Sequence, residues 1–149
     1  MISIRHRRVR PAAGFSLLEC LFAVLIFSVG ILALVLLQGR AISQSREAKY
    51  RVDASTLASQ MLGDMWVSER SATALAARFG SAAAGSGYTA WLTTVSSTLP
   101  GVAAYPPSVT VVANGALAGS TVTIDIYWKA PTEKAAAAAH RYTVTTQIT

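Results

Sequence analysis

Residues 15–37 form an apolar run in which Glu19 is the single charged residue. A helix rises about 1.5 Å per residue, so this run extends roughly 35 Å, more than the roughly 30 Å hydrocarbon core of a bilayer. The run is also longer than the apolar region of a secretory signal, and no small-residue cleavage site follows it. The pattern therefore predicts a retained transmembrane helix over residues 15–37.

The helical pattern continues after the apolar run. No proline occurs between residues 38 and 78, and Gly80 is a typical helix stop. Between these limits, apolar side chains recur at three- and four-residue spacing. They are Leu57, Ala58, Met61, Leu62, Met65 and Trp66. We therefore expect residues 38–80 to form the amphipathic half of one long helix, with this stripe packed in the core against a sheet.

The pattern changes to β structure in the last third of the chain. Residues 81–87 predict a loop, and residues 88–107 are ambiguous, with 92–95 either a short strand or a helical turn. Residues 121–128 and 142–148 alternate polar and apolar, and a short strand near Val109 and Val111 precedes a turn at Asn114 and Gly115. The alanine-rich connection 129–141 is a loop or a single helical turn. The predicted fold class is α+β, a long N-terminal helix packed on a small C-terminal antiparallel sheet.

Positive charge is concentrated at the start of the chain. The formal net charge is +6, from 13 Lys and Arg against 7 Asp and Glu, and Arg5, Arg7, Arg8 and Arg10 supply four of these charges. Basic residues beside an apolar helix stay on the cytoplasmic side, so they indicate topology and not a nucleic-acid surface. We expect a single pass through the bacterial inner membrane, with the C-terminal region in the periplasm.

Motifs for catalysis or cofactor binding are missing from the sequence. His6 and His140 are isolated, and no Cys/His group has zinc spacing. Neither a glycine-rich phosphate loop nor a G-x-S-x-G elbow occurs. We therefore expect no enzyme activity, no cofactor and no metal site, and we expect Asp53, Asp64 and Asp125 to be solvated.

Two residue types have competing interpretations. Trp91 and Trp128 are either packed in the core or at its rim, which we favour, or serve as surface anchors for a partner. Cys20 is the single cysteine, so no intramolecular disulfide is available. We expect Cys20 to be a small buried hydrophobe. A lipoprotein cysteine is the alternative, disfavoured because Glu19 precedes it where a small residue is expected.

A plain transmembrane helix does not explain Glu19. A charge at the bilayer centre costs about 2.5–3.5 kcal/mol on insertion scales, so an intramembrane carboxylate marks a functional position. The sequence Gly14-Phe15-Ser16-Leu17-Leu18-Glu19 follows a basic leader and opens the apolar run. In this context it resembles the prepilin peptidase motif of type IV pilins.

The resemblance implies a role for three residues. A prepilin is cleaved between Gly14 and Phe15, the new Phe15 amine is methylated, and Glu19, fifth in the mature chain, registers the subunit during assembly. The implied parts are a cleaved leader 1–14, a transmembrane half-helix 15–37, an amphipathic half-helix 38–80 and a loop and β region 81–149.

Further stretches resemble PilV-type minor pilins, namely residues 30–33, 37–38, 57–65 and 142–148. A single cysteine and the lack of a helix-bending proline in 15–37 argue against a major pilin. The resemblance implies a minor pilin subunit of a type IV pilus that reaches the cell surface and supports pilus assembly, adhesion and twitching motility. Implied partners are prepilin peptidase, the major pilin, other minor pilins and the inner-membrane assembly platform.

Two alternatives stay open. A minor pseudopilin of a type II secretion system shares the leader, the fold and the processing. A signal-anchored periplasmic binding protein or enzyme explains the apolar helix and its topology. It does not explain the junction of Gly14 and Phe15 followed by Glu19.

Overall fold

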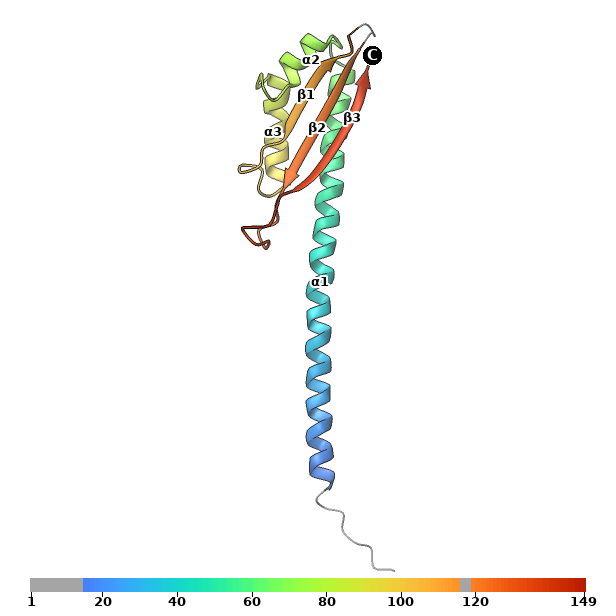
Figure 1. Cartoon of the computed structure of the whole chain (residues 1–149), viewed down its shortest axis with the longest axis vertical. Helices are drawn as coiled ribbons and strands as arrows, with labels where there is room; N and C mark the ends of the chain where they lie inside the picture. The colour runs from blue at the N-terminus through green and yellow to red at the C-terminus, as the bar shows by residue number, and fades with distance from the viewer. Residues whose placement is uncertain (1–14, 116–118) are drawn as a thin grey trace, which may run out of the picture. The chain divides into compact units, whose positions relative to one another are not determined.

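The computed structural model describes residues 15–115 and 119–149, in which three helices precede three strands (Figure 1). The chain separates into two units, one ending at Gln44 and the other comprising Ser45–Thr149. Helix α1 (Phe15–Trp66) contributes to both. The second unit also contains α2 (Ala72–Phe79), α3 (Ser86–Thr98), β1 (Ser108–Ala113), β2 (Ser120–Trp128) and β3 (His140–Ile148). The α+β class predicted from the sequence is confirmed.

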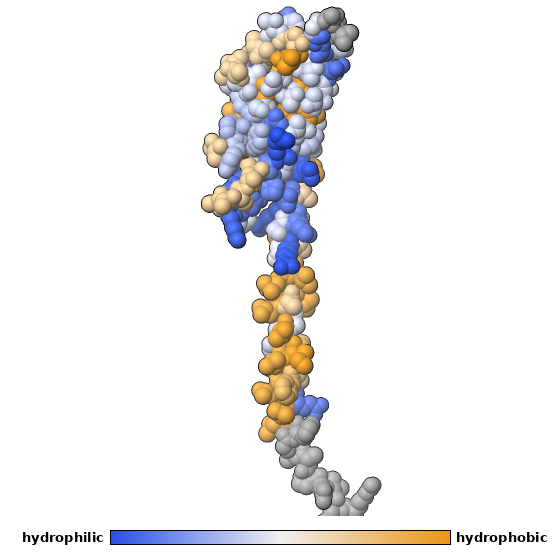
Figure 2. Space-filling model, viewed as in Figure 1, coloured by the Kyte–Doolittle hydropathy of each residue, from blue (hydrophilic) through white to orange (hydrophobic). Residues whose placement is uncertain are grey.

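The described part of the first unit is the beginning of α1, and from Leu17 to Leu37 its large side chains are apolar except for Glu19. These large apolar side chains are 47–77% exposed. Figure 2 shows them as hydrophobic side chains along the helix. Among the described residues, α1 is the one helix long and apolar enough to cross a membrane, with a window of mean hydropathy 3.0. A helix that is apolar on all sides requires an apolar environment, which is compatible with the predicted membrane anchor.

In the second unit, one face of α1 packs against one face of the sheet. The buried residues of α1 are Ala54, Leu57, Ala58, Met61 and Met65. Their spacing of three and four residues places them on one side of the helix. Leu62 is partly buried, and Trp66, the last residue of α1, is 44% exposed. The predicted core stripe is therefore confirmed up to Met65.

The three strands form an antiparallel sheet in the order β1-β2-β3. Along β2, buried and half-buried residues alternate, which is the period-two pattern of a strand covered on one face. The buried set comprises Ser120, Val122, Ile124, Ile126 and Trp128. Val109 of β1 and Ile148 of β3 extend the same core. The predicted strands are thus confirmed, in the positions where alternation indicated them.

Both tryptophans discussed above belong to the core. Trp91 is 6% and Trp128 is 2% exposed. The indole Nε1 of Trp91 donates to the carbonyl of Leu57 at 2.9 Å, which ties α3 to α1. Core packing is confirmed for this pair, and the alternative of surface anchors is wrong.

The single helix predicted up to Gly80 is divided in the structure. Helix α1 ends at Trp66 and α2 begins at Ala72. The Ser68 hydroxyl donates to a carbonyl in the last turn of α1 at 3.0 Å, and the Ser71 hydroxyl caps the start of α2 at 3.3 Å. Serine side chains compete for backbone partners and favour helix ends over helix interiors. The stop at Gly80 is confirmed, since Gly80 is the C-cap of α2.

The ambiguous region contains α3, which begins at Ser86, so the predicted loop ends at Gly85. Gly87 allows α3 to approach α2, because a Cβ there would lie 2.5 Å from the ring of Phe79. The connection between β2 and β3 has turns and no helix, which confirms the loop interpretation.

Candidate functional site

Glu19 lies on α1 within an apolar surface. Its neighbours on the helix are Leu18, Phe22, Ala23 and Ile26. The Glu19 side chain is exposed and forms no ion pair with any residue in the described ranges. A carboxylate held among apolar side chains and lipid is poorly solvated, so a positive charge supplied by another chain would bind it strongly.

The residues of the predicted cleavage junction adjoin this surface. Phe15 is the first residue of α1, and Glu19 follows about one helical turn later. Residues four apart lie on the same side of a helix. Gly14, with the rest of the leader 1–14, lies outside the described residues. Cleavage at Gly14, methylation of Phe15 and the registration role of Glu19 therefore stay predictions.

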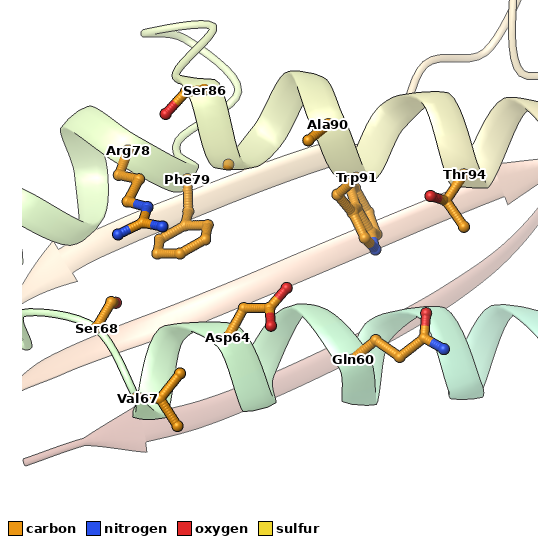
Figure 3. Close-up of a pocket in the computed structure, with 11 residues that line it drawn as sticks. Gln60, Asp64, Val67, Ser68, Arg78, Phe79, Ser86, Ala90, Trp91 and Thr94 are labelled. Atoms are coloured by element: carbon orange, nitrogen blue, oxygen red, sulfur yellow. The ribbon is translucent and has the colours of Figure 1, made fainter.

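The second unit has a groove of about 460 Å³ between the end of α1, α2 and α3. Figure 3 shows Gln60 and Asp64 on the α1 side, with Arg78 and Trp91 on the other. The Arg78 guanidinium lies over the Phe79 ring, 5.3 Å from its centroid. The charged groups that line the groove are one carboxylate, Asp64, and one guanidinium, Arg78.

A polar cluster that the sequence did not reveal holds the connection between β2 and β3. His140 lies with Nδ1 3.5 Å from a Glu47 carboxylate oxygen and Nε2 3.0 Å from a Glu133 carboxylate oxygen. Its ring stacks on Trp128, with centroids 5.7 Å apart. Lys129 Nζ donates to two carbonyls of the same connection, at 2.6 and 2.7 Å. The isolated His140 of the sequence thus gains two carboxylate partners, of which Glu47 is distant along the chain.

Two of the acidic residues expected to be solvated have partners. Asp53 pairs with Lys49 at 2.6 Å, and this hydrogen bond raises the pKa of the Lys49 ammonium. Asp125 accepts from the Thr143 hydroxyl at 2.5 Å and from Ser108 at 3.4 Å. Among the residues that the structure describes, no group of three or more His, Cys, Asp or Glu side chains is arranged to hold a metal ion.

Comparison with known protein families gives a match at the start of the chain. Residues 9–35 match a family model described as the prokaryotic N-terminal methylation motif. This range contains Gly14, Phe15 and Glu19. No curated protein and no solved structure matches the chain.

The match, together with the long apolar helix and the small antiparallel sheet, indicates a pilin-like or pseudopilin substrate of prepilin peptidase. Such proteins are structural subunits, so the match supports a structural subunit and not an enzyme. The motif also implies processing by prepilin peptidase and a pilus-assembly context, and the apolar helix is compatible with a membrane-anchored subunit.

Proposed function

We propose that this chain is a minor pilin subunit of a type IV pilus, processed by prepilin peptidase and supporting pilus assembly, adhesion and twitching motility. The observation that carries the proposal is the Glu19 carboxylate, which forms no ion pair among the described residues and lies one turn into an apolar helix that begins at Phe15. The methylation motif over residues 9–35 supports the same reading.

The chemistry of assembly follows from the charges at the start of the helix. Cleavage between Gly14 and Phe15 frees an α-amine whose ordinary pKa of about 7.7–8.0 keeps much of it protonated at neutral pH. Glu19 of an incoming subunit can then pair with the Phe15 amine of its neighbour. Removing one partner of a buried ion pair typically costs about 3–5 kcal/mol, which is enough to favour a paired register over an unpaired one.

Features of the described chain favour a minor over a major subunit. Cys20 is the single cysteine, so a C-terminal disulfide loop is not available. No proline bends the helix between residues 15 and 37. A minor pilin would reach the cell surface with the pilus, and its partners would be the major pilin, other minor pilins and the inner-membrane assembly platform.

A minor pseudopilin of a type II secretion system is the second candidate, because the same motif and helix serve both filaments. The two functions differ in what a deletion strain loses. Loss of surface pili and twitching, restored by the intact gene, supports the minor pilin. Loss of protein secretion with normal pili supports the pseudopilin.

The first test is peptide mass spectrometry of the membrane-extracted chain from cells with and without prepilin peptidase. We expect a mature chain that begins at N-methylated Phe15 only when the peptidase is present. A Gly14→Ala precursor in the same cells is the matched control, and it should keep the leader. If the arginine-rich leader persisted on the parent chain in both strains, the proposal would be rejected in favour of a signal-anchored protein.

A further inference from the structure

The two outer strands of the sheet differ in how their edges are covered. On the β1 side, the Val109 N–H donates to the Ser81 hydroxyl at 3.2 Å, and the Val109 carbonyl accepts from the Ser81 N–H at 3.0 Å. Helix α2 also lies alongside β1, whereas the closest element to β3 is β2 (Figure 1). The β1 edge is therefore covered at Val109 by the chain itself, whereas no such contact covers the outer edge of β3 among the described residues.

The pairing pattern identifies the free backbone groups of β3. In antiparallel strands, successive residues direct N–H and C=O alternately to one neighbour and to the other. The backbone N–H and C=O of Val109 point outward to Ser81, so the backbone groups of the even-numbered residues of β1 bond to β2. The register pairs these even-numbered residues with odd-numbered residues of β2. The even-numbered residues of β2 then bond to β3, where their partners are also even-numbered. The odd-numbered residues of β3 point their backbone groups away from the sheet: Arg141, Thr143, Thr145 and Gln147.

These four residues, hereafter the β3 edge, direct backbone N–H and C=O groups to a side where an added strand could bond to them. In the described ranges, no other segment forms a backbone hydrogen bond with them. Proteins usually protect such edges with proline, lysine, a bulge or a covering segment. The β3 sequence has neither proline nor lysine, and after Arg141 it is uncharged. Tyr142 and Val144, between the edge residues, are only partly buried against the core, so an added strand would also cover them.

We propose that the β3 edge accepts an extended strand from a different subunit of the filament, which rests on the proposed pilin-like function. The main-chain groups of the β3 edge require an extended backbone of about seven residues, because the four outward-pointing residues span positions 141–147. The neutral stretch from Thr143 onward fits uncharged side chains, and Arg141, exposed and without an ion pair among the described residues, fits an acidic side chain at one end. A second copy of this chain fits less well as the donor. On its β1 side Ser81 bonds to Val109 and α2 lies alongside the strand, and pairing of two β3 edges is a two-fold contact that does not continue along a filament.

The test is photo-crosslinking in cells that contain prepilin peptidase and the pilus apparatus. The full chain carries a photoreactive residue in place of Gln147. Thr145→Pro removes an N–H that points away from β2, while Thr145→Ala keeps that N–H and is the matched control. Val111→Pro makes the same change on the β1 side, where the Val111 N–H also points away from β2. Thr145→Lys blocks the β3 edge without altering the backbone, which keeps the test valid if the proline variant fails to fold.

We expect an adduct between this chain and a different chain that carries the N-terminal methylation motif. Its yield should fall about fivefold or more in Thr145→Pro and Thr145→Lys, the loss expected for at least one hydrogen bond, and persist in Thr145→Ala and Val111→Pro. An adduct only with a second copy, or one insensitive to Thr145→Pro and Thr145→Lys, overturns the proposal. A chain correctly processed to Phe15 but without the adduct overturns the edge proposal alone. A chain that keeps its leader overturns the proposed function as well.

Discussion

At the scale of single residues, polar groups in apolar surroundings carry most of the functional information. Glu19 is exposed on an apolar helix surface, where a positive charge from another chain can compensate its charge. Tyr88, in contrast, is buried and satisfied within the chain, since its hydroxyl donates to the Pro107 carbonyl at 2.8 Å. The first arrangement leaves an interaction for assembly, and the second stabilises the fold.

The Glu19→Ala change should separate processing from assembly. The junction of Gly14 and Phe15 is intact, so peptide mass spectrometry should find the same mature chain as in the parent. Incorporation into filaments should fall roughly a hundredfold or more, because the partner amine is left unpaired. Leu18→Ala, a change on the same apolar surface, is the control. Normal incorporation of Glu19→Ala would exclude the registration role.

The Tyr88→Phe change should lower stability and alter its dependence on pH. The Pro107 carbonyl loses its donor, which costs about 0.5–1.5 kcal/mol at neutral pH. Burial raises the pKa of the Tyr88 phenol above its ordinary value of 10.0. The unfolded chain therefore ionises first, so the contribution of the phenol is complete below about pH 10 and is lost as the pH rises through the folded-state pKa.

Chemical unfolding of the parent, Tyr88→Phe and the control Tyr105→Phe at pH 7 to 11 measures this effect. Tyr105 is 37% exposed, so its removal should change little. The stability gap between the parent and Tyr88→Phe should narrow above about pH 10. A gap that widens there would contradict a buried, neutral phenol.

At the scale of elements, side chains distant in sequence decide how segments end and are held. Ser68 and Ser71 divide a continuous helical pattern into α1 and α2. The alanine-rich connection after Trp128 has no regular structure, yet His140 ties it to Glu47 of α1 and Lys129 bonds to its carbonyls. Its conformation therefore depends on contacts with the rest of the second unit more than on local propensity.

The His140→Ala change should loosen this connection. The links to Glu47 and Glu133 and the stack on Trp128 are lost together, which we expect to cost about 1–2 kcal/mol. Hydrogen exchange of residues 129–139 should become faster, while exchange in β1 stays the same. Lys134→Ala, at an exposed position of the same connection, is the control. Unchanged exchange in His140→Ala would mean that the cluster does not hold the segment.

At the scale of the whole molecule, the two units have separate physical tasks. The apolar part of α1 satisfies its backbone internally and needs lipid or other apolar helices around it. The second unit has its own core, formed where the stripe of α1 meets the sheet and α3. The processing motif lies in the sequence of the first unit, so recognition by the peptidase should not require the second unit to be folded.

An Ile124→Ala change tests this separation. Ile124 is fully buried, so truncation should destabilise the second unit by about 2–5 kcal/mol. Leader removal, followed by mass spectrometry, should equal that of the parent, whereas incorporation into filaments should fall. The exposed Val112→Ala change in the same sheet should affect neither. A leader retained in Ile124→Ala would show that the peptidase depends on the folded second unit.

The sequence by itself determined the features that depend on neighbours along the chain. Apolar length predicted the membrane helix, period-two alternation predicted the β2 and β3 strands, and the motif around Glu19 indicated pilin-like processing. Tertiary structure decided the features that depend on contacts between distant residues: the break after Trp66, the helix α3, the partners of His140 and the unequal sheet edges. Hydrophobic periodicity reports which face is buried, but hydrogen-bond partners such as Ser81 and Val109 meet only after folding, so no local pattern encodes them.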